Sequence, residues 1–146
     1  GVLAERGNSA LVFRGRDNGL DELTSTTVNQ VWLVRDGAVD YAEVDATRLG
    51  IAPSTVADLR GADPAHNAQV GRDLLAGKED IISDTVLLNA AAGLVAYGVE
   101  GTTEGGIEDR LAAGLGIARD ALADGRAQAV VDRWIAFSRE HATHEK

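Results

Sequence analysis

The sequence contains no cysteine among its 146 residues. Disulfide bonds and thiolate metal sites are therefore excluded, and the composition fits a reducing compartment. Basic residues are also scarce: 14 Lys and Arg stand against 23 Asp and Glu, which gives a formal net charge of -9. General binding of nucleic acid needs a basic face, so this class of partner is disfavoured. A small anionic ligand stays compatible, because a metal ion can reverse the sign of charge within a site.

Long apolar runs are missing as well. No stretch approaches the ~20 apolar residues of a membrane span, and no basic segment followed by an apolar one opens the chain. We therefore expect a cytoplasmic protein without a membrane partner. The opening GVLAERG is typical of the last turn of a helix, with Val2 and Leu3 on the buried side and Gly7 as its end. We expect the chain to begin inside an element and to be a piece of a longer protein.

Strand patterns are concentrated in the first third of the sequence. Short apolar runs at 9–14, 30–35 and 38–45 predict strands. Asp36-Gly37 between the last two is a strong two-residue hairpin signal. Polar and apolar residues alternate through 38–45, so one face of the hairpin is expected to be solvated.

Helical patterns follow, and we expect one piece of an α/β domain with strands and a β-hairpin early and helices late. A short helix is predicted from Ser54. A second begins at Pro64 with Asp63 as its N-cap. A third, from Ser83 or Asp84 to Tyr97, is apolar nearly all round and is therefore expected to be buried. Apolar residues at helical spacing predict two more helices, one up to Asp124-Gly125 and one through Val130 and Phe137, before a polar tail that frays.

The candidate chemistry lies in RDNGLDELTSTT, residues 16 to 27. Asp21 and Glu22 are adjacent acids that follow Gly19, and in a turn their carboxylates can converge on one cation or serve two. Mg2+ takes carboxylate oxygens and usually keeps water and substrate phosphates as further ligands. The segment follows a predicted strand end, where open α/β sheets bind ligands. A solvated acidic loop explains the same residues without any ligand.

Other polar residues have structural explanations. The hydroxyl run from Thr24 to Thr27 can donate to phosphate, but more often leads into a strand. Arg14 and Arg16 can pair with an anion, although neutralising Asp17 and Asp21 is the simpler interpretation. Asn89 lies within the apolar helix and is expected to tie that helix to a neighbouring loop. No histidine has ligand spacing.

Three motifs in order, GLDELT, LRGADPAHNA and DTVLLNAAAGLVAYG, resemble the C-terminal portion of the anthranilate phosphoribosyltransferase family, over residues 1 to 138. The resemblance implies transfer of a 5-phosphoribosyl group from phosphoribosyl pyrophosphate to anthranilate, with Mg2+ and release of pyrophosphate. It implies that Asp21 and Glu22 bind the metal. It also implies that the phosphate loop, the anthranilate contacts and the helical domain that forms the homodimer lie outside this chain.

Two departures from the family pattern bear on the site. Arg14-Gly15 replaces a frequent His-Gly, and the loop is one residue longer at Asn18. Two other functions stay open at this point. One is a related phosphoribosyltransferase or nucleoside phosphorylase with another acceptor. The other is a non-catalytic α/β module that acts as a scaffold or binds a partner.

Overall fold

The computed structural model describes residues 1–142, which divide into two compact units. The first unit holds residues 1–60 and 79–118, and it contains the sheet and the candidate site. The second holds residues 61–78 and the part of the chain that follows 118. Its elements are α2 (Pro64–Leu75), the end of α4 (Ile107–Ala123) and α5 (Arg126–His141), and neither α2 nor α5 contains a buried residue.

The sheet has three antiparallel strands in the order β1-β2-β3, namely β1 (Ala10–Gly15), β2 (Asn29–Arg35) and β3 (Ala38–Val44). The three predicted strands are confirmed. The predicted hairpin is confirmed too, since Asp36 and Gly37 have φ of 51° and 78°. Positive φ at both central residues gives a turn whose twist matches that of the strands.

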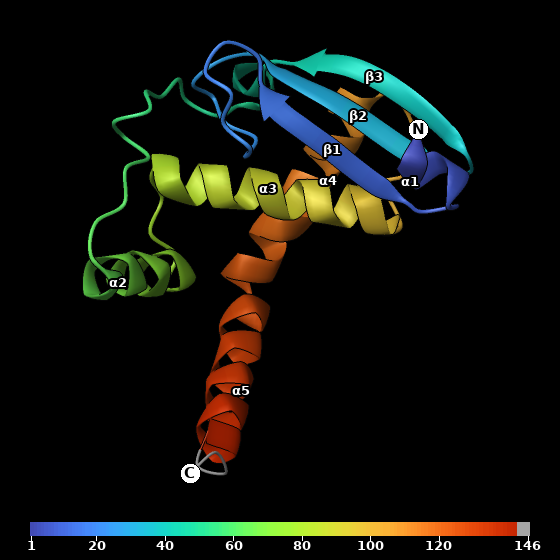
Figure 1. Ribbon diagram of the computed structural model, residues 1–146. Coiled ribbons are helices and arrows are strands. Elements are labelled where there is room, and N and C mark those ends of the chain that lie inside the picture. The colour runs from blue at the N-terminus through green and yellow to red at the C-terminus, as the bar shows by residue number, and fades with distance from the viewer. Residues whose placement is uncertain (143–146) are drawn as a thin grey trace. The chain divides into compact units, whose positions relative to one another are not determined.

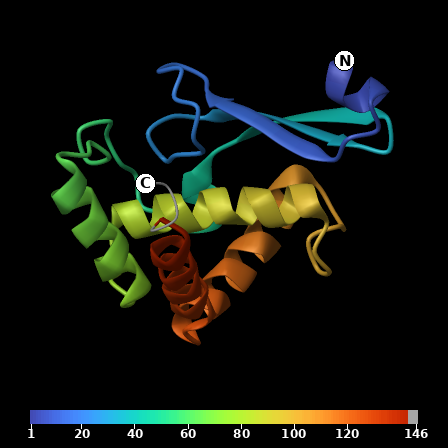
Figure 2. The same cartoon turned by 60° about the horizontal axis from the view of Figure 1, so that its bottom comes forward.

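One face of the sheet is covered by helices. Figures 1 and 2 show α3 (Ile81–Tyr97) running along one face of the sheet, with α4 on the same side. Aliphatic side chains from the inner face of the sheet and from both helices form one buried cluster, which includes Val31, Leu33, Leu88, Val95, Leu111 and Leu115. On the opposite face Val39 and Tyr41 are exposed, and the Tyr41 ring lies 5.3 Å from that of Trp32. A solvated face of the hairpin is therefore confirmed, but it carries the apolar residues of the alternating pattern.

The two core helices of the first unit approach closely at a glycine. A Cβ built on Gly114 of α4 would lie 3.0 Å from the carbonyl oxygen of Ala91 in α3. Gly114 and Ala91 are both buried. The absence of a side chain at position 114 therefore sets the separation of the helices that support the site.

Three helix predictions were wrong in detail. Helix α3 begins at Ile81 because Asp80 is its N-cap and accepts a hydrogen bond from the Ser83 amide at 2.9 Å. Only one face of α3 is buried, and Val86 on the other face is 45% exposed. No helix starts at Ser54. Residues 56–59 form turns, in which the backbone hydrogen bonds join an amide to the carbonyl three residues earlier.

The ends of the described chain also differ from expectation. Helix α1 (Val2–Glu5) ends before Gly7 as predicted, but Val2 and Leu3 are exposed instead of buried. Four residues form only about one helical turn, which is too short to bury a whole face. Helix α5 continues to His141, well into the tail that was expected to fray. The prediction for the last residues, 143–146, falls outside the described part of the chain.

Candidate functional site

The two candidate ligands lie in the loop between β1 and β2. The chain bends at Asp21 and Glu22, and both side chains are exposed. Within residues 1–142 neither carboxylate takes part in a hydrogen bond or an ion pair. Their four oxygens are therefore available to an external cation.

The first half of the loop is closed by its own hydrogen bonds. The Gly15 amide donates to the Leu20 carbonyl at 2.7 Å, and the Gly19 amide donates to the Gly15 carbonyl at 3.1 Å. Gly19 has φ of 69°, which confirms that a glycine permits the turn. The Asn18 amide group fills the loop, accepting from the Leu20 amide at 3.1 Å and donating to Thr26 Oγ1 at 2.8 Å. The Asn18 side chain thus closes the loop from inside.

The neighbouring arginines bond to groups other than the acidic pair. Arg16 forms ion pairs of 3.3 Å with Asp17 and with Glu43. Arg14 donates to Gln30 Oε1 at 2.9 Å. Pairing with Asp17 was predicted correctly, whereas pairing with Asp21 was not. The hydrogen bond from Thr27, followed by that from Arg16, lowers the pKa of Asp17 below its ordinary value.

The hydroxyl run is part of the scaffold. Thr24 and Thr26 share a hydrogen bond of 2.6 Å, and Thr27 donates to Asp17 at 2.6 Å. Ser25 donates to the Ala52 carbonyl at 2.7 Å. The structural interpretation of these residues is confirmed, because all four hydroxyl groups already have partners inside the protein.

Asn89 ties α3 to the loop, as predicted. Its Oδ1 accepts from the Leu23 amide at 3.0 Å, and its Nδ2 donates to the Leu23 carbonyl at 2.8 Å. Leu23 follows Glu22 directly, and its side chain is fully buried in the core. An asparagine within an apolar helix was the signal for this contact.

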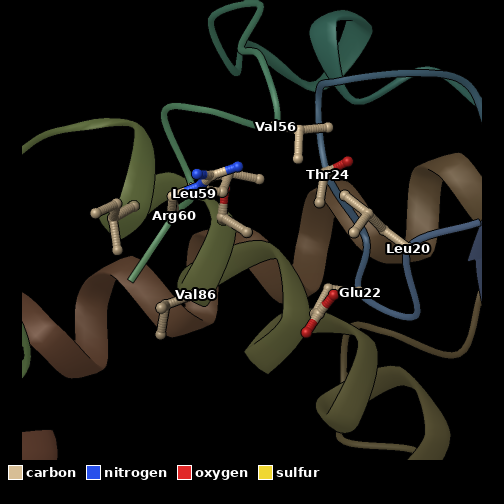
Figure 3. Close-up of a pocket in the computed structure, with 9 residues that line it drawn as sticks. Leu20, Glu22, Thr24, Val56, Leu59, Arg60 and Val86 are labelled. Carbon is tan, nitrogen blue, oxygen red and sulfur yellow. The ribbon is translucent and has the colours of Figure 1, made fainter. Parts of the chain in front are cut away.

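A pocket of about 350 Å³ adjoins the loop within the first unit, and no sequence pattern indicated it. Three segments that are distant in sequence form its walls, namely 20–24, 56–60 and the first turns of α3. Figure 3 shows Glu22 on the side of α3 and the aliphatic residues Leu20, Val56 and Val86 around the cavity. The lining residues are Leu20, Glu22, Thr24, Val56, Leu59, Arg60, Ile82, Thr85 and Val86.

The carboxylate pair has the donor chemistry for a hard cation. Among residues 1–142, no group of three or more His, Asp or Glu side chains is placed to hold a metal ion by itself. Two exposed carboxylates without partners suit Mg2+, which is typically bound by one or two carboxylates together with water and substrate phosphates. The residues therefore fit a divalent cation whose remaining ligands come from outside the described residues.

Membrane insertion finds no support in the helices. None of those formed by residues 1–142 combines the length and apolar character that crossing a bilayer requires.

Comparison with known proteins places this geometry in a family. Residues 2–128 match the model described as "Glycosyl transferase family, a/b domain". The chain is 50% identical over 139 residues to the anthranilate phosphoribosyltransferase of Arthrobacter sp. strain FB24, covering 95% of this chain and 39% of that protein. It is 49% identical over 138 residues to the enzyme of the same name from Streptomyces griseus, covering 94% of this chain and 38% of that protein.

The fold agrees with a solved structure. The crystal structure of anthranilate phosphoribosyltransferase from Thermus thermophilus matches with a TM-score of 0.75 at 33% identity, covering 92% of this chain and 37% of that one. The α/β fold class is thereby confirmed. The chain spans about two fifths of the length of the curated relatives it matches. The matched residues include the sheet, the core helices and the acidic loop. Since the family model covers most of its length, the chain belongs to the glycosyl transferase family and forms part of its α/β domain.

Proposed function

We propose that this chain is the C-terminal part of an anthranilate phosphoribosyltransferase of tryptophan biosynthesis. The reaction transfers 5-phosphoribosyl from phosphoribosyl pyrophosphate to the amine of anthranilate and releases pyrophosphate. The observation that carries the proposal is the identity of about half over 94–95% of this chain to proteins of that name. The fold match to the Thermus thermophilus enzyme supports it.

Asp21 and Glu22 are the residues that would hold Mg2+ in this enzyme. Their exposure and their lack of partners in the described chain leave the oxygens free for a cation. When bound, Mg2+ neutralises the negative charge that develops on a departing pyrophosphate. The contribution of the chain is to fix the backbone that carries two consecutive carboxylates, because a closed loop precedes them and a buried leucine follows them.

We also propose that the complete enzyme acts in the cytoplasm as a homodimer, through a helical domain that this chain does not contain. The absence of cysteine is in keeping with a reducing compartment. The proposal for the dimer rests on the family resemblance.

A chimaera tests the proposed function. This chain replaces the matching 139 residues of the Arthrobacter enzyme, and anthranilate consumption with phosphoribosyl pyrophosphate is followed against Mg2+ concentration. We expect activity, and a dimer on size-exclusion chromatography. Asp21→Asn should lower the activity and raise the half-saturating Mg2+ concentration at least ~10-fold, since even the loss of outer-shell partners costs 10–100-fold in metal affinity.

The matched control is Asp40→Asn, which makes the same charge change at an exposed position of β3. It should leave the Mg2+ titration unchanged. An active chimaera in which Asp21→Asn and Glu22→Gln both titrate like the parent would refute the metal role. A folded but inactive chimaera would refute the assignment of this chain to the reaction.

A further inference from the structure

Two asparagines hold the backbone directly after the acidic pair. The Leu23 amide and carbonyl bond to Oδ1 and Nδ2 of Asn89, at 3.0 and 2.8 Å. The Thr24 amide and carbonyl bond to Oδ1 and Nδ2 of Asn29, at 3.1 and 2.8 Å. Two consecutive residues thus have both of their backbone polar groups bonded to a side-chain amide. We call this arrangement the two-amide clamp.

Each asparagine of the clamp is fixed on a different rigid element. Asn89 lies in α3 and also donates to the Thr85 carbonyl at 2.9 Å. Asn29 begins β2, is fully buried and also donates to the Val44 carbonyl at 3.2 Å. The clamp therefore joins the loop to the core helix and to the central strand at adjacent residues.

The chemistry of the clamp is specific to a side-chain amide. Only an amide presents one acceptor and two donors on the same planar group. A carboxylate would face the Leu23 and Thr24 carbonyls without a proton to donate. A hydroxyl has a single proton and cannot bond the amide and two carbonyls at once. The residue type at positions 29 and 89 is therefore explained by the loop that each one holds.

The clamp acts on the candidate ligands through the backbone that carries them. Within residues 1–142 the carboxylates of Asp21 and Glu22 have no bonds of their own, so their placement follows from the backbone. The Gly15–Leu20 hydrogen bond fixes the chain on one side of the pair. The clamp fixes it on the other side, from the residue after Glu22 onward.

We propose that Asn89 and Asn29 are positioning residues that hold the Asp21 and Glu22 carboxylates in register for a divalent cation. This inference rests on the proposed function, from which it takes the metal role of the pair. Two exposed carboxylates bind a cation more tightly when the backbone between them does not have to be ordered on binding.

The test uses Mn2+ as a spectroscopic probe that accepts the same oxygen ligands as Mg2+. Binding to the chimaera that contains this chain is measured by electron paramagnetic resonance with pyrophosphate present, and amide hydrogen exchange of residues 21–24 is measured on the same samples. Asn89→Ala removes both hydrogen bonds from the Asn89 side chain to the Leu23 backbone. Asn89→Ser is the milder variant, because a helical serine bonds the carbonyl four residues back, here that of Thr85, and leaves Leu23 unheld.

The chain offers a matched control in Asn67. Its Oδ1 accepts from the Ala62 amide at 3.0 Å and its Nδ2 donates to the Ala62 carbonyl at 3.1 Å. Asn67→Ala therefore removes the same kind of two-point bond from another loop. It controls for the loss of such a bond elsewhere in the chain.

We expect both Asn89 variants to raise the Kd for Mn2+ about 10-fold and to accelerate exchange at 21–24, as loss of a supporting residue does at metal sites. Asn67→Ala should change neither quantity. Faster exchange with an unaltered Kd would overturn the positioning role. Mn2+ binding that Asp21→Asn does not weaken would instead overturn the metal assignment, and with it the role proposed for the clamp.

Discussion

Replacing Gly114 by alanine tests the close approach of the two core helices that support the acidic loop. The new Cβ would lie 3.0 Å from the Ala91 carbonyl oxygen and 3.1 Å from the Ala91 Cβ. Both atoms belong to the buried face of the regular helix α3 and cannot swing aside as a flexible side chain would. Overpacking of a core typically costs about 1–3 kcal/mol.

The matched control is Gly116→Ala, two residues further along the same helix. Gly116 is exposed, and a Cβ there would meet no atom within 4 Å. Alanine in a helix interior is about 0.8–1.0 kcal/mol more favourable than glycine. Both substitutions gain this helix-propensity term, so it cancels from their difference. The difference in unfolding free energy is then the packing cost alone, about 1–3 kcal/mol.

Urea unfolding measures this difference. The sequence has two tryptophans, and the exposed Trp134 lies in the second unit, so a Trp134→Phe background leaves Trp32 as the reporter of the first unit. With a slope of about 2 kcal/mol/M, the midpoints of the two variants should differ by about 1 M. Gly116→Ala should lie above the parent midpoint. Equal midpoints for Gly114→Ala and Gly116→Ala would refute the helix contact.

Two further predictions concern the loop. Gly15→Ala should loosen the loop, because a Cβ at Gly15 would overlap the side-chain amide oxygen of Asn18. Since that oxygen accepts from the Leu20 amide, we expect faster hydrogen exchange at Leu20. Unchanged protection of this amide would contradict the close contact between Gly15 and Asn18. Thr27→Val should raise the pKa of Asp17 towards its ordinary value, because the Thr27 hydroxyl is the main cause that lowers it. A folded-state pKa below the unfolded one contributes stability that is present above the unfolded pKa and is lost as pH falls through the lowered pKa. The variant should therefore lose this contribution at a higher pH, and carboxyl NMR titration that finds the Asp17 pKa unmoved would exclude the Thr27 bond as its cause.

Local chemistry explains why parts of this fold were predictable. The Asp36-Gly37 turn is specified by two residues that accept positive φ, and α2 by a capping aspartate before a proline. These signals act over two or three residues. The start of α3 at Ile81 was missed although Asp80 is a cap of the same kind, because Ser83 and Asp84 offered competing caps within one turn.

The strands, the hairpin, the order of the main helices and the acidic pair could be recognised from the sequence, because each is encoded by neighbours along the chain. The sequence also indicated that Asn89 must find partners, since an amide in an apolar helix has few other choices. The partners themselves follow from the packing of segments that are far apart in the sequence. Leu23 lies 66 residues from Asn89 in the sequence. Both Asn29 and Asn89 bond to backbone groups, which are the same in every residue and therefore give no pattern in the sequence. The pocket beside Glu22 has the same origin, because its walls come from three segments that only the folded core brings together.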